Sequence, residues 1–260
     1  VAAGAFVGYK VWGAAAKAPE GKYLYIHTGS DLGDVKKLLK EKGVLKSMDW
    51  FNRVANWKSF KSIKPGRYEI KKGMSINDLV NMLKGGLQSP VNFVITKIRT
   101  KEVFAKKVGT ALECDSLRMI NFLNNNDTLK KYGLDTNSVM SVVMPDTYTY
   151  FWNTTPEKVF QKLYAAHQRF WTDERKAKAA KQGVTPLQAI TVASIIDEET
   201  NAPSDRPNIA SVYLNRVKKG MPLGADPTIK FALKDFALKQ ILYEHLKFPS
   251  PYNTYLNKGL

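Results

Sequence analysis

The 260-residue sequence predicts an α+β protein, in which a small domain of strand–turn–helix units precedes a larger, mainly helical domain. Two patterns predict this class. The first part of the chain contains short β-rich runs that are each followed by a turn and an apolar-periodic helix, whereas the second part consists of segments with helical periodicity. The composition is 44% hydrophobic and 24% charged, as in an ordinary globular protein, which disfavours disorder and coiled coil.

The strand–turn–helix pattern occurs three times. Residues 23–27, 67–70 and 91–96 are predicted strands, and an apolar-periodic helix follows each of them. Ser30 and Ser75 are the predicted N-caps of the first two helices. The spacing between the copies is irregular, so the pattern is not that of a solenoid.

The second part begins near residue 121 and is predicted to be mainly helical. Thr185, followed by Pro186 and Gln188, has the pattern of a helix start, and Gly183 and Gly220 are candidates for helix ends. The predicted helices cover residues 156–171, 173–182, 186–200, 206–219 and 227–243.

The N-terminal residues are predicted to lie outside both domains. Residues 1–16 are small and apolar except for Lys10, and Tyr9 and Trp12 are typical of the interfacial end of a membrane-spanning helix. We interpret residues 1–21 as the trimmed end of a single N-terminal membrane anchor and a linker, with a flexible tail as the alternative. The small domain is then expected at 22–90 and the larger domain at 91–260.

The charge favours a polyanionic partner. The 40 lysine and arginine residues exceed the 23 aspartate and glutamate residues by 17, and residues 51–100 alone hold ten basic and two acidic residues. Nucleic acid, an anionic membrane surface and an acidic cell-wall polymer would each fit this excess. No helix-turn-helix, RNP motif or zinc finger is present, so nucleic acid is not the expected partner.

Metal chemistry is not expected. The single cysteine, Cys114, can form neither an intrachain disulfide nor a CxxC site. His27, His167 and His245 are far apart and form no zinc-binding motif.

Three consecutive carboxylates, Asp197, Glu198 and Glu199, close an apolar predicted helix. Acidic residues near a helix C-terminus interact unfavourably with the helix dipole, so the placement of three carboxylates there needs an explanation. At 100° per residue Glu198 falls opposite the apolar arc, whereas Asp197 and Glu199 lie at its edges. Glu199 has the bulkier apolar neighbours and the longer side chain, and desolvation is what suits a carboxyl group to general acid catalysis. The alternative is that Glu199 is paired with one of the many lysines.

Segment 66–86, GRYEIKKGMSINDLVNMLKGG, resembles a LysM repeat. In that fold a groove binds N-acetylglucosamine chains. The resemblance therefore implies a LysM-like domain that either binds sugar or acts as a spacer.

A longer resemblance covers nearly the whole chain. MPDTY (144–148), ASIIDEET (193–200), IASVYLNRVKKGMPLGADPTIKFAL (209–233) and SPYNTY (250–255) occur in the order and spacing of the YceG-like family of endolytic lytic transglycosylases. The resemblance implies a lysozyme-like catalytic domain with Glu199, the glutamate before the threonine, as the catalytic residue. Members often carry glutamate at position 197 and lysine at position 198. The family continues past the position that matches residue 260, which implies that the catalytic domain is C-terminally incomplete here.

The resemblance also implies a reaction. A glutamate acting as general acid and then base would cleave the MurNAc-β-1,4-GlcNAc bond and leave 1,6-anhydro-MurNAc ends, without a cofactor. Asp226, Thr228, Asn253 and Tyr255 are the candidate substrate-binding residues, although Asp226 is also a candidate N-cap. Tyr148 and Trp152 are compatible with two roles: packing in the core, or stacking against a bound sugar ring.

The implied setting is the bacterial cell envelope. The expected partners are peptidoglycan glycan strands, an anionic membrane surface and cell-wall synthases of the division or elongation machinery. The expected location is the inner membrane, with the catalytic part on the periplasmic side. The alternative function is that of a non-catalytic peptidoglycan-binding or scaffold protein.

Overall fold

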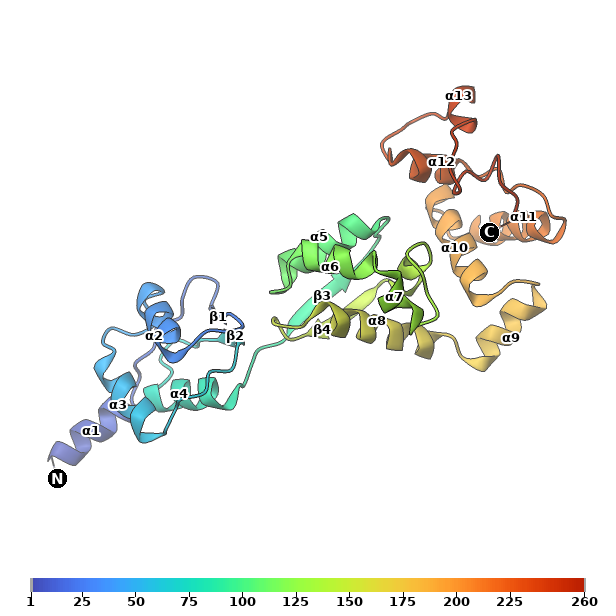
Figure 1. Cartoon of the computed structure of the whole chain (residues 1–260). Coiled ribbons are helices and arrows are strands. Elements are labelled where there is room, and N and C mark those ends of the chain that lie inside the picture. Colours follow the sequence, from blue (N-terminus) through green and yellow to red (C-terminus); the bar gives the residue numbers. More distant parts are fainter. Residues whose placement is uncertain (1, 260) are drawn as a thin grey trace. The chain divides into compact units, whose positions relative to one another are not determined.

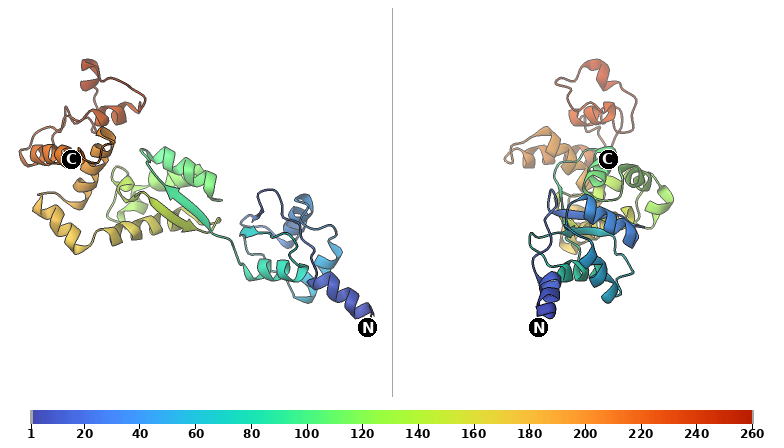
Figure 2. Two further views of the ribbon diagram at one scale, coloured as in Figure 1. Left: turned by 180° about the vertical axis from the view of Figure 1, so that it is seen from behind. Right: turned by 90° about the vertical axis from the view of Figure 1, so that its left-hand side faces the viewer.

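The computed structural model describes residues 2–259 and confirms the predicted α+β class. The chain divides into two compact units, which Figures 1 and 2 show in three views. Unit 1 comprises Val1–Asn124 and Pro145–Phe160, and unit 2 comprises Asn125–Met144 and Gln161–Leu260. The predicted domain boundary at residue 90 falls inside unit 1, and the corresponding division into domains stays a prediction.

Unit 1 combines helices with two antiparallel pairs of strands. Its elements, in chain order, are α1 (Ala2–Trp12), β1 (Tyr23–Ile26), α2 (Leu32–Glu41), α3 (Asp49–Trp57), β2 (Gly66–Glu69), α4 (Ile76–Gly85), β3 (Val91–Ile95), α5 (Lys101–Ala111), α6 (Ser116–Leu123), β4 (Asp146–Tyr150) and the start of α8 (Pro156–Phe170). Strand β1 pairs with β2, and β3 pairs with β4. The three predicted strand–turn–helix units are thus present as β1–α2, β2–α4 and β3–α5.

One of the two predicted N-caps is correct. The Ser75 hydroxyl accepts the backbone N–H of Asp78 at 3.1 Å and begins α4. In α2, however, the N-cap is Asp31 and not Ser30. The carboxylate of Asp31 accepts the N–H of Asp34, and the Asp34 carboxylate accepts the N–H of Asp31. This reciprocal pair satisfies two otherwise unpaired donors, which explains why the helix begins one residue later.

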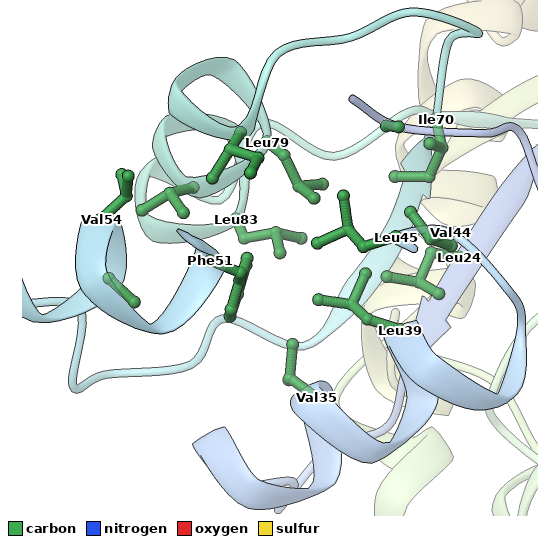
Figure 3. Close-up of a cluster of buried hydrophobic side chains, with 14 of the residues drawn as sticks. Leu24, Val35, Leu39, Val44, Leu45, Phe51, Val54, Ile70, Leu79 and Leu83 are labelled. Atoms are coloured by element: carbon green, nitrogen blue, oxygen red, sulfur yellow. The ribbon is translucent and has the colours of Figure 1, made fainter. Parts of the chain in front are cut away.

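The first core of unit 1 lies between the β1–β2 pair and helices α2, α3 and α4. Leu24 of β1, Leu39 of α2 and Phe51 of α3 are almost completely buried, and Leu79 and Leu83 of α4 pack into the same cluster (Figure 3). Each such side chain contributes about 1.5–3 kcal/mol through removal of apolar surface from water. The cluster therefore accounts for much of the stability of this half of the unit.

A second group of aromatic residues packs beside the β3–β4 pair. The ring of Phe93 lies 6.2 Å from that of Phe104 and 6.0 Å from that of Tyr150. Tyr148 and Trp152 are 5% and 9% exposed, so both belong to buried packing of unit 1. This placement favours the core interpretation of these two aromatics.

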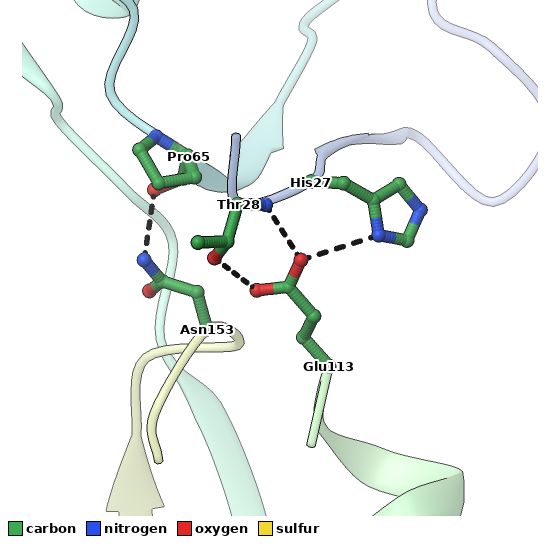
Figure 4. Close-up of polar contacts among 5 residues, drawn as sticks. All are labelled: His27, Thr28, Pro65, Glu113 and Asn153. Atoms are coloured by element: carbon green, nitrogen blue, oxygen red, sulfur yellow. Dashed lines mark hydrogen bonds and ion pairs between the residues drawn. The ribbon is translucent and has the colours of Figure 1, made fainter. Parts of the chain in front are cut away.

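Polar contacts join the two halves of unit 1 (Figure 4). The Glu113 carboxylate accepts the backbone N–H and the hydroxyl of Thr28, both at 2.6 Å, and lies 3.2 Å from Nδ1 of His27. The side-chain amide of Asn153 donates to the carbonyl of Pro65 at 3.2 Å. The Glu113 contacts tie the end of β1 to the segment that follows α5, and the Asn153 contact ties the segment after β4 to the start of β2.

Unit 2 is helical. Its elements are α7 (Asn126–Lys130), the 3₁₀ helix η1 (Val139–Val142), the remainder of α8, α9 (Asp173–Lys181), α10 (Pro186–Glu199), α11 (Arg206–Lys218), α12 (Asp226–Leu233) and α13 (Tyr243–Leu246). Gly183 and Gly220 adopt positive φ just after α9 and α11, as expected for residues that follow a helix C-cap.

The predicted helix at 227–243 is wrong in its second half. Helix α12 ends at Leu233, because Lys234 adopts a left-handed conformation with φ of 55° and caps the helix. Local periodicity could not reveal this end, since lysine is ordinarily a good helix former. The helix also begins at Asp226 with Ala225 as its N-cap, so the alternative N-cap role of Asp226 is wrong.

The N-terminal helix does not resemble a membrane span. Helix α1 has 11 residues, whereas about 20 are needed to cross a bilayer. Within residues 2–259, no helix combines the length and the apolar character that crossing would require. The interpretation of residues 1–21 as the trimmed end of an anchor and a linker stays a prediction.

Candidate active site

Helix α10 positions the three carboxylates. It begins with a capping box in which the Thr185 hydroxyl accepts the N–H of Gln188 and the Gln188 side chain accepts the N–H of Thr185. Its buried residues are Val192, Ile195 and Ile196, which pack with Tyr213, Leu223 and Ala225. The helix ends at Glu199, because Thr200 is extended. The apolar face thus fixes α10 against α11 and α12, and the carboxylates occupy its last turn.

The three carboxylates have different surroundings. Asp197 forms an ion pair with Arg206, whose Nη2 lies 3.1 Å from Oδ1 of Asp197. Glu199 accepts a hydrogen bond from the Tyr213 hydroxyl at 2.6 Å. Asp197 and Glu198 are half-buried and Glu199 is exposed, so Glu199, and not Glu198, is the most exposed of the three carboxylates. The helical wheel does not predict this order of exposure, because α10 ends at Glu199 and no further helical turn covers the Glu199 side chain.

Glu199 has a sparse polar environment. Tyr213 is its hydrogen-bond donor, and within residues 2–259 no lysine, arginine or histidine forms an ion pair with it. The alternative of a lysine-paired helix-end residue therefore lacks a partner in the described chain. A carboxyl group with one neutral donor keeps hydrogen-bonding capacity for a ligand, since a carboxylate can accept about four hydrogen bonds.

Tyr255 is hydrogen-bonded to Asp226 and lies close enough to Glu199 for the Glu199 charge to act on it. The Tyr255 hydroxyl donates to Oδ1 of Asp226 at 2.6 Å. Burial, the hydrogen bond to Asp226 and the negative charges of Asp226 and Glu199 raise the pKa of Tyr255 to about 12. Burial and the hydrogen bond to Glu199 also raise the pKa of Tyr213. Both phenols are therefore protonated at neutral pH and act as donors to carboxylates.

A loop clasp holds Tyr255 in place. We use this name for the contacts between residues 222–228 and 253–258. The hydroxyls of Thr228 and Thr254 lie 2.8 Å apart, the N–H of Ala225 donates to the Thr254 hydroxyl at 2.9 Å, and the N–H of Gly224 donates to the Thr254 carbonyl at 2.9 Å. The clasp joins the start of α12 to a loop 29 residues further along, and so brings Tyr255 to Asp226.

Two of the predicted substrate-binding residues are internal parts of this loop structure. Asn253 is completely buried, and its amide donates to the carbonyls of Leu246 and Phe248 at 2.9 and 2.8 Å. Thr228 is 8% exposed and donates to the Ala225 carbonyl at 2.6 Å. The structure thus brings Asp226 and Tyr255 together with Glu199 and places Thr228 and Asn253 behind them.

Tyr213 was not among the residues predicted from the sequence, and Arg216 was expected to serve packing or a salt bridge. The two residues are three positions apart on α11 and therefore share a face of that helix. The guanidinium of Arg216 donates to the carbonyl of Leu223, and its positive charge acts on Tyr213 and Tyr255. Gly224 has φ of 59°, and a Cβ atom there would lie 3.3 Å from Nη1 of Arg216, so glycine suits this position. The signal available in the sequence was their three-residue spacing, which places a tyrosine and an arginine on the same face of a helix.

An apolar groove lies on another side of α10. It has a volume of about 430 Å³ and is lined by Val192, Ala193 and Ile196 together with Phe170, Trp171 and neighbouring residues of α9 and α11. Arg175 and Lys178 are its charged lining residues, and no carboxylate lines it. Acid–base chemistry in unit 2 is therefore assigned to the Glu199 side of α10 and not to this groove.

The group of Glu199, Tyr213, Asp226 and Tyr255 can perform proton transfer. The carboxyl groups of Glu199 and Asp226 are both exposed, and each accepts a hydrogen bond from a protonated tyrosine. In residues 2–259, no three histidine, cysteine, aspartate or glutamate side chains gather in a way that would hold a metal ion. The chemistry that this group can supply is that of a general acid and base.

Comparisons with known proteins identify the family of the chain. The model of the YceG-like family matches residues 24–260. The chain is 29% identical to the endolytic murein transglycosylase of Bacillus subtilis, over 90% of this chain and 69% of that protein. It is 26% identical to the protein of the same name from Streptococcus pneumoniae, of which it spans about half, namely 48%. The crystal structure of a YceG-like protein from Listeria monocytogenes superposes with a TM-score of 0.58 at 25% identity, covering 92% of this chain and 84% of that one.

Proposed function

The chain belongs to the YceG-like family, and from this premise we propose that it is an endolytic lytic transglycosylase, a lyase that acts on the glycan strands of peptidoglycan. The relatives from Bacillus and Streptococcus, both named endolytic murein transglycosylases, support this activity. The observation that carries the proposal is the surroundings of Glu199. Its carboxyl group is exposed, accepts one hydrogen bond from Tyr213 and has no ion-pair partner within residues 2–259.

The proposed reaction needs a single catalytic carboxyl group. Glu199 in its protonated form gives its proton to the oxygen of the MurNAc-β-1,4-GlcNAc bond, and the bond between that oxygen and C1 of MurNAc breaks. The Glu199 carboxylate then takes the proton from the C6 hydroxyl of the same MurNAc, whose oxygen bonds to C1 and closes a 1,6-anhydro ring. The substrate thus supplies its own nucleophile, so no second carboxylate has to activate a water molecule, in contrast to most glycosidases.

The neighbouring residues have supporting roles in this proposal. Tyr213 holds the Glu199 carboxyl group in one orientation through its 2.6 Å hydrogen bond. Asp226 and Tyr255 offer a carboxylate oxygen and an aromatic ring to the sugar, whereas Thr228 and Asn253 keep the loop clasp in place. A substitution of either clasp residue would therefore act through the position of Tyr255.

The proposed substrate places the activity outside the cytoplasm, where peptidoglycan is assembled. The basic surface suits an anionic partner in that compartment, because 17 more basic than acidic residues attract anionic polymers or lipids. Sugar binding by the LysM-like segment and association with cell-wall synthases stay predictions.

Digestion of purified peptidoglycan tests the proposal. We expect the wild-type chain to release muropeptides with 1,6-anhydro-MurNAc ends, identified by mass spectrometry, and we expect Glu199→Gln to release none above background. Products with reducing ends would instead indicate a hydrolase, in which water and a second carboxylate take the place of the C6 hydroxyl. No release of glycan by a folded wild-type chain would favour a binding or scaffold protein.

A further inference from the structure

Arg216 of α11 is a half-buried cation beside the proposed active site. Helix α11 packs against α10, which carries Glu199 at its end (Figure 1). In the part of the chain that the structure describes, no aspartate or glutamate lies within ion-pair distance of the Arg216 guanidinium. Removing an unpaired charge from water costs free energy, so stability alone does not explain this placement.

The guanidinium of Arg216 holds the segment that leads into α12. It donates to the carbonyl of Leu223, a completely buried residue just before the N-cap Ala225. A Cβ atom on Gly224 would lie 3.3 Å from Nη1 of Arg216 and 3.6 Å from the Tyr255 ring, so both groups approach this glycine closely. Arg216 therefore ties α11 to the loop clasp at the point where the clasp presents Tyr255.

Arg216 also lies close to two tyrosine–carboxylate pairs. Tyr213 precedes it by three residues on the same face of α11 and donates to Glu199 at 2.6 Å. Tyr255 donates to Asp226 at 2.6 Å. Burial raises the pKa of both phenols, and the charge of Arg216 acts in the opposite direction on each, which requires the guanidinium to be near both. Arg216 is thus the residue that the two pairs share.

We propose that Arg216 is a positioning residue for bond cleavage and that it acts through Tyr213 and Tyr255. This inference rests on the proposed function. The hydrogen bond from Arg216 to the loop clasp fixes the clasp relative to α11, so that both phenols reach their carboxylates in one arrangement. Its positive charge offsets the repulsion between Glu199 and Asp226, whose negative charges both act on Tyr255.

Steady-state kinetics of the 260-residue chain on purified glycan strands tests the proposal. Arg216→Met keeps an aliphatic stem and removes the charge and the donors. We expect kcat to fall about 10–100-fold, as for the loss of a hydrogen bond from a charged group, and KM to change by less than about 3-fold. Arg216→Lys keeps the charge without the planar fork of donors, so it should recover part of the loss. A loss confined to KM would overturn the proposal.

The effect of Arg216 should depend on the two phenols. In a chain that carries Tyr213→Phe and Tyr255→Phe, adding Arg216→Met should lower kcat by about 3-fold at most, because the groups through which it acts are already gone. The full loss in this background would overturn the proposal. Arg206→Met is the matched control, since Arg206 also lies on α11 and pairs with Asp197 at the surface, and kcat should stay within about 2-fold. An equal loss in this control would also contradict the role of Arg216.

A readout that does not depend on cleavage separates this proposal from the proposed function. In protein labelled with ¹³C at tyrosine Cζ, the NMR signals of Tyr213 and Tyr255, assigned from the two Phe variants, should shift in Arg216→Met and stay in place in Arg206→Met. Arg216→Lys provides the same comparison if Arg216→Met does not fold. Unchanged signals in an active protein would overturn the role of Arg216 alone. Shifted signals in a wild-type chain that does not cleave peptidoglycan would overturn the proposed function, and the positioning role with it.

Discussion

Glu113 in unit 1 and Glu199 in unit 2 both accept a 2.6 Å hydrogen bond from a hydroxyl group, but they differ in how much of their hydrogen-bonding capacity is used. Glu113 accepts two hydrogen bonds from Thr28 and also lies 3.2 Å from the His27 ring, so both of its oxygens are engaged. Glu199 accepts a hydrogen bond from Tyr213 on Oε1 and has no ion-pair partner within residues 2–259.

In our proposal, this difference distinguishes a structural carboxylate, Glu113, from the proposed catalytic carboxylate, Glu199. The side chain of Glu113 is 17% exposed and links two halves of one unit, so its interactions stabilise the fold. Glu199 is exposed at the end of α10, where the packing of Val192 and Ile195 already fixes the helix. A carboxyl group that the fold does not need is free to exchange a proton with a substrate. The following substitutions test this distinction.

The largest expected effect is that of Glu199→Gln on bond cleavage. Glutamine keeps the size and the contact with Tyr213 but cannot transfer a proton, so the rate should fall by about 10²–10⁴-fold. The melting temperature should stay within about 1–2 °C of the wild type, because the side chain is exposed. Release of anhydro-muropeptides and thermal unfolding measure the two quantities. Full activity in this variant would remove Glu199 from the mechanism.

Glu113→Gln should show the opposite behaviour. The amide can present only one acceptor oxygen to the partners of the carboxylate, and we expect a loss of about 1–3 kcal/mol in the free energy of unfolding. Peptidoglycan cleavage by the folded fraction should be unchanged. Denaturant unfolding followed by circular dichroism measures the loss. If cleavage fell 100-fold with no change in unfolding, the assignment of the two carboxylates would have to be reversed.

Tyr213→Phe should have a smaller effect on the rate. It removes the hydroxyl that orients Glu199 and keeps the buried ring, so we expect kcat to fall about 10-fold, which corresponds to about 1.4 kcal/mol. If Tyr213 positions Glu199 without binding sugar itself, KM should change by less than about 3-fold. Steady-state kinetics on isolated glycan strands separates the two parameters, and an effect confined to KM would contradict the positioning role.

Tyr255→Phe should reduce stability by about 1 kcal/mol at neutral pH, since it removes the hydrogen bond to Asp226. The pKa of Tyr255 is raised to about 12, so the native state holds this proton more tightly than the unfolded chain. Its contribution is therefore complete below pH 10 and is lost as the pH rises toward 12. Melting temperatures measured from pH 8 to pH 11 should converge for wild type and variant. Parallel curves would contradict this linkage.

The smallest effect is expected for Asp197→Asn. The ion pair with Arg206 is about half exposed, and such pairs contribute about 0–1 kcal/mol. Cleavage should stay within about 2-fold of the wild type, because this carboxylate is already occupied and lies away from Tyr213. Loss of activity here, together with normal activity in Glu199→Gln, would show that the sequence analysis selected the wrong carboxylate.

Local signals account for the parts that the sequence predicted well. The capping box of Thr185 and Gln188 and the N-cap Ser75 depend on residues three positions apart, and both are present. The end of α12 was missed because Lys234 adopts a conformation that its residue type does not favour.

Contacts between distant segments could not be predicted from the sequence. Tyr255 meets Asp226 across 29 residues, and Thr28 meets Glu113 across 85. Neither pair has a local pattern, because each depends on how whole helices and strands pack. The three consecutive carboxylates were visible in the sequence, but it is the hydrogen bond from Tyr213 to Glu199 and the ion pair of Arg206 with Asp197 that distinguish their surroundings.

The loop clasp has a consequence for the order in which the chain acquires its site during synthesis. Glu199 and Tyr213 are 14 residues apart and can meet as soon as α10 and α11 have left the ribosome. Tyr255 and its anchor Thr254 emerge later, and until then Asp226 has no phenol beside it. Since chains fold from the N-terminus during translation, the site would be completed only after Tyr255 has left the ribosome. A nascent chain released before residue 255 would carry Glu199 and Tyr213 without the phenol that hydrogen-bonds to Asp226.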